Sequence, residues 1–176
     1  MEEAKGITVI FTGDGKGKTS AALGVVARSL GHGKKCKIIQ FIKGRRRSGE
    51  HYLAERLAPD LEIVMSGKGF TWLADVSRED HETQAQEGLK LAEEAITSGR
   101  YAVVALDEIL YALRSGLVKI EQVEKLIDLR PEGSHLVLTG RDAPQRLIDK
   151  ADLVTNMQVI KHPKQAGIPA QKCMDY

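Results

Sequence analysis

The residues best suited to chemistry lie together near the start of the chain, in a glycine-rich stretch that ends in Gly-Lys-Thr. We expect this stretch to bind the phosphates of a nucleoside triphosphate through Gly13, Asp14, Gly15, Lys16, Gly17, Lys18, Thr19 and Ser20. An apolar run at residues 7–11 precedes it, and residues 21–30 follow with helical apolar spacing. Strand, glycine-rich turn and helix is the context of a phosphate-binding loop, where backbone N–H groups and a helix N-terminus converge on an anion.

Two side chains of this loop have specific expected roles. Lys18 would lie along the phosphates as a catalytic charge, and the Thr19 hydroxyl would ligate Mg²⁺. The pattern has one irregularity, because the general motif has glycine five residues before Gly17 and this chain has Thr12 there. A plain glycine-rich turn would explain the glycines but not Gly-Lys-Thr at the helix start. The sequence therefore predicts binding of a nucleoside triphosphate.

A second group of polar residues follows two later apolar runs. Asp107 and Glu108 come after residues 101–106, and Arg141 comes after residues 135–139. Because parallel strands end at one edge of a sheet, these side chains are expected near the phosphate loop. In phosphate-loop enzymes an acidic residue at such a strand end reaches the metal. We favour Glu108 as that catalytic ligand and Asp107 as a helix cap, with the reverse left open. Arg141 could bind phosphate or be an ordinary surface arginine.

The remaining sequence alternates between strand and helix patterns. Strands are expected at residues 7–11, 37–42, 61–65, 101–106, 135–139 and 152–159. Helices are expected at residues 21–30, 79–98, 108–114 and 120–129. One more should begin at Asp142 as its cap, with Pro144 in the first turn. Such alternation is typical of an α/β fold of the phosphate-loop type, with a mostly parallel sheet and helices on both faces.

Composition and charge restrict the class of protein and of partner. The chain has 176 residues, 42% hydrophobic and 28% charged, which is typical of one soluble globular domain over residues 1–176. Residues 160–176 have no periodicity and are expected to be an irregular C-terminal tail. We favour His162 as a tail residue held by hydrogen bonds, and the alternative is a polar contact in the active cleft. A net charge of +2 gives no reason to expect a nucleic-acid partner. The positive cluster between Lys34 and Arg47 is either a solvated loop or a phosphate contact.

The same sequence offers no sign of a membrane or an oxidising compartment. The longest apolar runs have the length of strands, and the start of the chain lacks the apolar region of a signal peptide. Cys36 and Cys173 are far apart and form no disulfide or metal motif. We therefore expect a cytoplasmic protein without a membrane partner.

Further motifs are spread over nearly the whole chain. They are at residues 11–19, 31–35, 40–44, 49–50, 69–72, 106–108, 130–131, 138–141, 151–155, 161–163, 166–168, 170–172 and 175–176. With these motifs in this order, the sequence resembles the ATP:corrinoid adenosyltransferases of the phosphate-loop type, which act in the cobalamin pathway. A phosphate loop alone would be unspecific. Its combination with Gly69-Phe70-Thr71-Trp72 and the tail is specific.

The resemblance implies a reaction and its participants. The Co(I) ion of a corrinoid would attack the C5′ atom of ATP, so that a Co–C bond forms and tripolyphosphate leaves. Cob(I)alamin, cobinamide or cobyrinic acid a,c-diamide would be the substrate, in adenosylcobalamin synthesis or salvage. Co(I) has no proton to lose, so no general base is needed. The family also implies Mg²⁺ with ATP, ATP held in the reverse direction along the loop, a homodimer, and a reduced flavoprotein as electron donor.

The aromatic pair acquires a role only through this resemblance. In isolation, two aromatic residues so close in sequence usually pack in a core. By resemblance, Phe70 and Trp72 are catalytic residues that lie where the corrinoid's lower ligand would sit. Apolar groups there would exclude that ligand and make Co(II) easier to reduce. Residues 45–50 would line or cover the corrinoid pocket.

Two other classes of function remain open from the residues alone. A kinase or NTPase would use Asp107 or Glu108 as a base and residues 45–47 as a lid, and would transfer the γ-phosphoryl group. A non-enzymatic nucleotide-gated protein or corrinoid carrier would release neither tripolyphosphate nor ADP. A GTPase is disfavoured because the chain has no Asn-Lys-x-Asp motif. Product identity separates these classes, since only the adenosyltransferase releases tripolyphosphate.

Overall fold

A computed structural model describes residues 5–43, 47–67, 69 and 76–176 of the chain. Within these residues, six strands form one sheet in the order β3-β2-β4-β5-β1-β6, and every neighbouring pair is parallel. The strands are β1 (Thr8–Thr12), β2 (Cys36–Gln40), β3 (Leu61–Met65), β4 (Val103–Asp107), β5 (His135–Thr139) and β6 (Leu153–Asn156). The order places β5 between β1 and β4, so the phosphate loop and the Asp107 end of β4 lie one strand apart.

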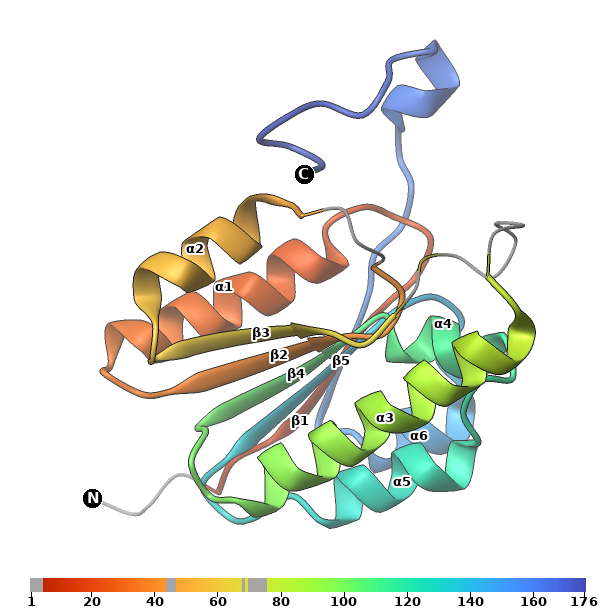
Figure 1. Cartoon of the computed structure of the whole chain (residues 1–176). Helices are drawn as coiled ribbons and strands as arrows, with labels where there is room; N and C mark the ends of the chain where they lie inside the picture. Colours follow the sequence, from red (N-terminus) through yellow and green to blue (C-terminus); the bar gives the residue numbers. More distant parts are fainter. Residues whose placement is uncertain (1–4, 44–46, 68, 70–75) are drawn as a thin grey trace.

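Helices cover both faces of this sheet. They are α1 (Lys18–Gly31), α2 (Gly49–Leu57), α3 (Arg78–Thr97), α4 (Ile109–Arg114), α5 (Ile120–Asp128) and α6 (Gln145–Lys150), with a short 3₁₀ helix η1 (Pro163–Ala166) in the tail. Helices α1 and α2 lie on one face, and α3, α4, α5 and α6 lie on the other (Figure 1). The predicted α/β architecture is therefore confirmed. In the parts of the chain described here, no helix is both long enough and apolar enough to cross a bilayer.

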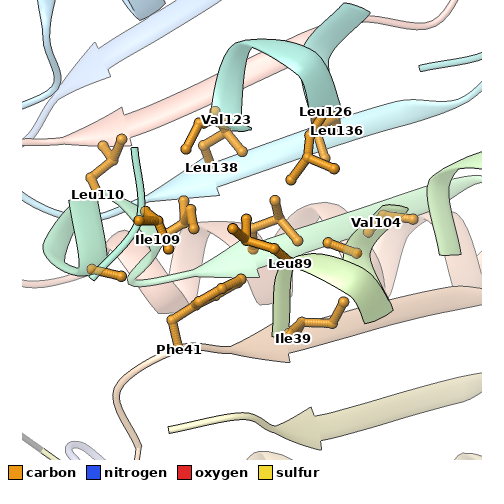
Figure 2. Close-up of a cluster of buried hydrophobic side chains, with 14 of the residues drawn as sticks. Ile39, Phe41, Leu89, Val104, Ile109, Leu110, Val123, Leu126, Leu136 and Leu138 are labelled. Carbon is orange, nitrogen blue, oxygen red and sulfur yellow. The ribbon is translucent and has the colours of Figure 1, made fainter. Parts of the chain in front are cut away.

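Successive residues of each central strand belong to different cores. Val9 packs with Ala22 and Val26 of α1, whereas Ile10 packs in the cluster that includes α3, α4, α5 and α6. The same alternation holds for the pairs Ile38 and Ile39, Ala105 and Leu106, and Val137 and Leu138. Figure 2 shows the larger core, where Leu89 of α3 faces Ile39 and Val104 of the sheet. Burial on both faces explains why these strands are continuously apolar.

One helix was not predicted from the sequence. Helix α2 occupies residues for which no element was expected, and it buries only His51 and Ala54. Its larger apolar side chains, Tyr52, Leu53 and Leu57, are all exposed, so the segment adds little to either core. Its start is set locally instead, because the Ser48 side chain and the His51 side chain cap each other's backbone N–H groups.

Several expected boundaries were wrong, and three of them are instructive. Asp142 does not cap α6: it has φ 56°, its carboxylate accepts a hydrogen bond from Arg114 at 2.6 Å, and Pro144 is the N-cap. Strand β6 ends at Asn156, not at residue 159, because the chain then turns along the phosphate loop. Strand β2 ends at Gln40, and the buried side chains of Phe41 and Ile42 follow outside the sheet.

Candidate functional site

A cavity of about 450 Å³ opens at the carboxyl edge of the sheet. Residues 14–20 of the phosphate loop form one wall, Glu108 and Arg141 contribute from the ends of β4 and β5, and residues 173–176 of the tail close another side. The structure thus brings together all the expected phosphate-binding residues except Gly13, which lies at the base of the loop and does not line the cavity. The loop, both strand ends and the tail meet directly at this edge of the sheet.

Lys18 is anchored by the loop that it follows. Its Nζ atom donates hydrogen bonds to the carbonyl oxygens of Gly13 at 2.6 Å and Gly15 at 2.7 Å, and the residue is 7% exposed. An ammonium group has three N–H donors, so one remains for a ligand in the cavity. Burial lowers the pKa of Lys18, while the negative charge of Glu108 opposes this change. The side chain is therefore held ready to contact an anion.

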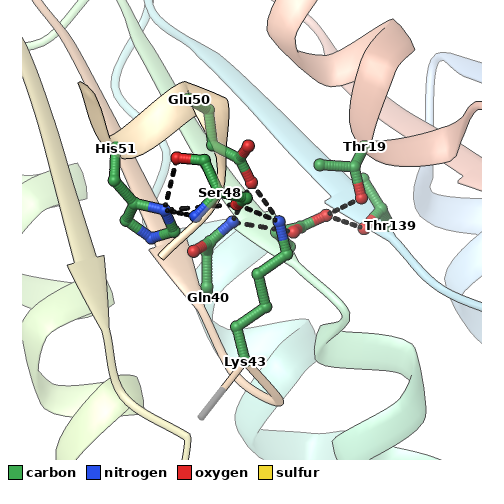
Figure 3. Close-up of polar contacts among 8 residues, drawn as sticks. Thr19, Gln40, Lys43, Ser48, Glu50, His51 and Thr139 are labelled. Atoms are coloured by element: carbon green, nitrogen blue, oxygen red, sulfur yellow. Dashed lines mark hydrogen bonds and ion pairs between the residues drawn. The ribbon is translucent and has the colours of Figure 1, made fainter. Parts of the chain in front are cut away.

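Thr19 meets an acidic residue from across the sheet. The Thr19 Oγ1 hydroxyl donates to Oδ1 of Asp107 at 2.8 Å, and Thr139 donates to the same oxygen at 2.8 Å (Figure 3). Nε2 of Gln40 approaches the other carboxylate oxygen at 3.3 Å. Asp107 is 1% exposed and belongs to β4, so it does not cap the following helix as expected. Its position is set by strand order, since β5 supplies Thr139 between β4 and β1.

The oxygens of Thr19 and Asp107 fit a magnesium ion. A hydroxyl and a carboxylate are the hard donors that Mg²⁺ prefers, and Mg²⁺ normally takes only one or two protein carboxylates together with substrate phosphates and water. Across the described ranges, no cluster of three or more His, Cys, Asp or Glu residues could hold a metal by itself. The residues therefore suit a metal that arrives with a nucleotide.

Glu108 faces the same cavity from a strained backbone position. It has φ 60°, a left-handed conformation that is unfavourable for a residue with a side chain, and its N–H donates to Oγ1 of Thr139 at 2.9 Å. Burial and the adjacent charge of Asp107 raise the pKa of Glu108, whereas Lys18 and Arg141 lower it. The expected role of Glu108 as a Mg²⁺ ligand stays a prediction. Asp107, which contacts Thr19 directly, is a second candidate.

A polar network next to the cavity was not foreseen from the sequence. Lys43 forms an ion pair with Glu50, and Gln40 joins Glu50 to Asp107 through its side-chain amide (Figure 3). Burial opposes ionisation of Glu50, but hydrogen bonds from Lys43 and Ser48 outweigh it and hold the pKa of Glu50 at about 2. Glu50 therefore stays charged at neutral pH. The sequence contained one signal for this network. Gln40 is the last residue of β2 and Asp107 is the last residue of β4, so the two residues lie at the same edge of the sheet.

In the structure the C-terminal tail begins directly after β6, at Met157, and its first residues determine the shape of the phosphate loop. The Gly15 N–H donates to the Met157 carbonyl at 2.7 Å, and the Met157 N–H donates to the Thr12 carbonyl at 2.8 Å. Thr12 is the last residue of β1, and Gly13 makes the turn with φ 96°. The irregular glycine spacing thus follows from a strand that extends one residue further and from a second chain segment lying against the loop.

Replacing Gly15 with alanine should destabilise the protein by about 1–3 kcal/mol, because the added methyl overpacks a rigid contact. A Cβ atom there would lie 2.8 Å from the carbonyl oxygens of Met157 and Gln158. Gly24 in α1 is the matched control, since a Cβ there meets nothing within 4 Å and alanine should stabilise the helix by about 0.5–1 kcal/mol. Urea unfolding measures both. Equal changes in stability at the two positions would contradict a close contact between the tail and the phosphate loop at Gly15.

Other expected site residues have more limited contacts. Arg141 pairs with Asp14 at 3.1 Å, at the mouth of the cavity. His162 lines the cavity and its Nδ1 accepts the Lys164 N–H at 3.1 Å, as the first residue before η1. Phe70 and Trp72 lie outside the described residues, as does part of the 45–50 segment.

Comparison with known proteins gives one consistent result. Residues 4–176 match the family model described as ATP:corrinoid adenosyltransferase BtuR/CobO/CobP. A corrinoid adenosyltransferase of Pseudomonas aeruginosa is 37% identical over 174 residues, covering 99% of this chain and 85% of that protein. One of Sinorhizobium sp. is 39% identical over 176 residues, covering 99% and 82%. Among solved structures, a KaiC-like protein of Pyrococcus horikoshii is similar in fold, with a TM-score of 0.54 at 18% identity, covering 90% of this chain and 75% of that one.

Proposed function

Because this chain belongs to the ATP:corrinoid adenosyltransferase family, we propose that it transfers the 5′-deoxyadenosyl group of ATP to the Co(I) ion of a corrinoid and releases tripolyphosphate. The observation that carries this proposal is the cavity in which Lys18, Thr19 and Arg141 surround space for a polyphosphate. The corrinoid would be cob(I)alamin, cobinamide or cobyrinic acid a,c-diamide.

In this reaction the protein needs to do little to activate the nucleophile, and its main task is to stabilise the leaving group. As the Co–C5′ bond forms, the C5′–O bond breaks and its electron pair leaves with tripolyphosphate. No proton is transferred, so the protein must position the reactants and stabilise the departing charge. The free N–H of Lys18 and the cations of Lys16 and Arg141 line the cavity where that charge would develop.

Thr19 would hold Mg²⁺ together with Asp107 or Glu108. When bound with ATP, Mg²⁺ would supply further positive charge for the polyphosphate. The Thr19–Asp107 hydrogen bond of 2.8 Å supports this assignment, because two oxygens at that separation are close enough to be ligands of one small ion. Thr139 and Gln40 would keep the Asp107 carboxylate in place.

The corrinoid side of the site rests on the family resemblance. Phe70 and Trp72 would exclude the lower axial ligand, and residues 45–50 would line the corrinoid pocket. A homodimer, a reduced flavoprotein electron donor and a cytoplasmic location belong to the same proposal. Lys43 and Glu50 give partial support, because Lys43 precedes that segment, Glu50 ends it, and both line the phosphate cavity.

An anaerobic assay tests the proposed reaction. Purified protein, Mg-ATP and chemically reduced cob(I)alamin should give loss of the Co(I) spectrum and a light-sensitive alkylcorrinoid. One tripolyphosphate should appear for each corrinoid consumed, because the C5′–O bond is the one that breaks. Formation of ADP or monophosphate with an unchanged cobalt spectrum, for each of the three corrinoids, would contradict the proposal and favour a kinase or NTPase.

A further inference from the structure

The end of the chain returns to the loop at which the tail begins. After Met157 leaves the loop, the tail extends away from the sheet and turns back toward α1 and α2 (Figure 1). Residues 173–176 then line the same cavity as the phosphate loop. Much of the intervening segment is exposed, including Ile160 at 91%. The tail therefore contacts the site at its two ends.

The returning end places a carboxylate on a loop cation. Asp175 forms an ion pair with Lys16, with the Asp175 side chain 17% exposed and the Lys16 side chain 51% exposed. Oδ2 of Asp175 also accepts the Gln171 N–H at 2.7 Å, and the Asp175 N–H donates to the Gln171 carbonyl at 2.8 Å. The carboxylate is thus held by its own turn, independently of Lys16.

The Asp175 carboxylate is therefore paired with Lys16, one of the cations that line the cavity. If the cavity takes a polyphosphate, Asp175 and that ligand compete for the Lys16 ammonium. The half-exposed Lys16 limits the size of this effect, because water screens exposed charges. Lys16 has room to exchange partners, whereas the turn keeps Asp175 in place.

We propose that Asp175 is a built-in competitor for polyphosphate. It holds Lys16 when the loop is empty, and it takes Lys16 back as tripolyphosphate leaves, which weakens retention of this product. The inference rests on the proposed function for the identity of the polyphosphate. It assigns to the C-terminal turn a role in product release that is separate from the chemical step.

Asp175→Asn tests this inference by calorimetric titration with Mg-tripolyphosphate, without corrinoid. Asparagine keeps an oxygen for the Gln171 N–H but removes the charge. The variant should bind tripolyphosphate about three- to tenfold more tightly, and the gain should shrink at high salt. Product inhibition of adenosyl transfer by tripolyphosphate should strengthen by the same factor.

Two further variants assign the effect to the Lys16 contact. In a Lys16→Ala background, Asp175→Asn should change the affinity much less, because the cation for which the anions compete is gone. Asp128→Asn is the matched control, since it breaks a lysine–aspartate pair of 2.6 Å with Lys150 on the protein surface. It should leave tripolyphosphate affinity unchanged.

The opposite sign would overturn the inference. Weaker or unchanged tripolyphosphate binding by Asp175→Asn would mean that Asp175 positions Lys16 or has no role, and so would a gain that persists without Lys16. Failure of the wild-type protein to bind tripolyphosphate would also overturn it. Failure of the proposed function would look different, because binding and its dependence on Asp175 would persist while no adenosyl group reached cobalt.

Discussion

Lys18→Ala should lower kcat/KM for adenosyl transfer to pre-reduced corrinoid by about a thousandfold, which is the scale for loss of one well-placed donor to a developing charge. The Lys18 ammonium is held by the carbonyl oxygens of Gly13 and Gly15 and offers its remaining N–H to the cavity. Alanine removes the charge next to the leaving group and also leaves two loop carbonyls without their donor. Initial rates of Co(I) consumption measure the effect.

Lys34→Ala is the matched control for this loss. Lys34 lies at the opposite, amino edge of the sheet, beside Arg100 and Ser134, so its removal should leave the rate within about twofold. Circular dichroism and a thermal melt establish that each variant is folded. Near-normal turnover by a folded Lys18→Ala variant would show that this loop does not hold the leaving polyphosphate.

Asp107→Asn should raise the Mg²⁺ concentration needed for half-maximal activity by at least about tenfold. Asp107 accepts a hydrogen bond from the Thr19 hydroxyl, so its carboxylate lies close enough to contact an ion bound to Thr19. Glu108→Gln is an isosteric change one residue away, and it should raise the Mg²⁺ requirement by less than about threefold, because no contact ties Glu108 to Thr19 within the described residues. Mg²⁺ titration at saturating ATP measures both.

The comparison between the two variants decides which carboxylate is the ligand. A larger effect at Glu108 would assign the metal to Glu108, as the sequence pattern favours, and would leave Asp107 as the group that orients Thr19 and Thr139. Because Asp107 is buried in a network, a thermal melt must accompany the activity data. Loss of folding without a change in Mg²⁺ dependence would count against Asp107 as a ligand.

Much of the architecture could be predicted from local patterns. Strands β3 and β5 have the expected bounds, and α5 ends within one residue of the expected position. Strand β5 and helix α5 carry a strong apolar run or periodicity because each buries a broad face, whereas β3 is an edge strand in which only Leu61 is buried. Helix α2 was missed because it buries so little, and Asp142 was misjudged because its partner, Arg114, is distant in sequence. Local patterns do not report such contacts.

The site divides in the same way. Gly-Lys-Thr after a strand determined the phosphate loop, because a short strand, turn and helix specify that geometry among neighbouring residues. Only the tertiary structure placed Asp107 on Thr19, 88 residues away, and the two ends of the tail on Gly15 and Lys16. Those contacts depend on which strands lie side by side at the carboxyl edge of the sheet. Strand order is set by the packing of the whole core, which no single segment encodes.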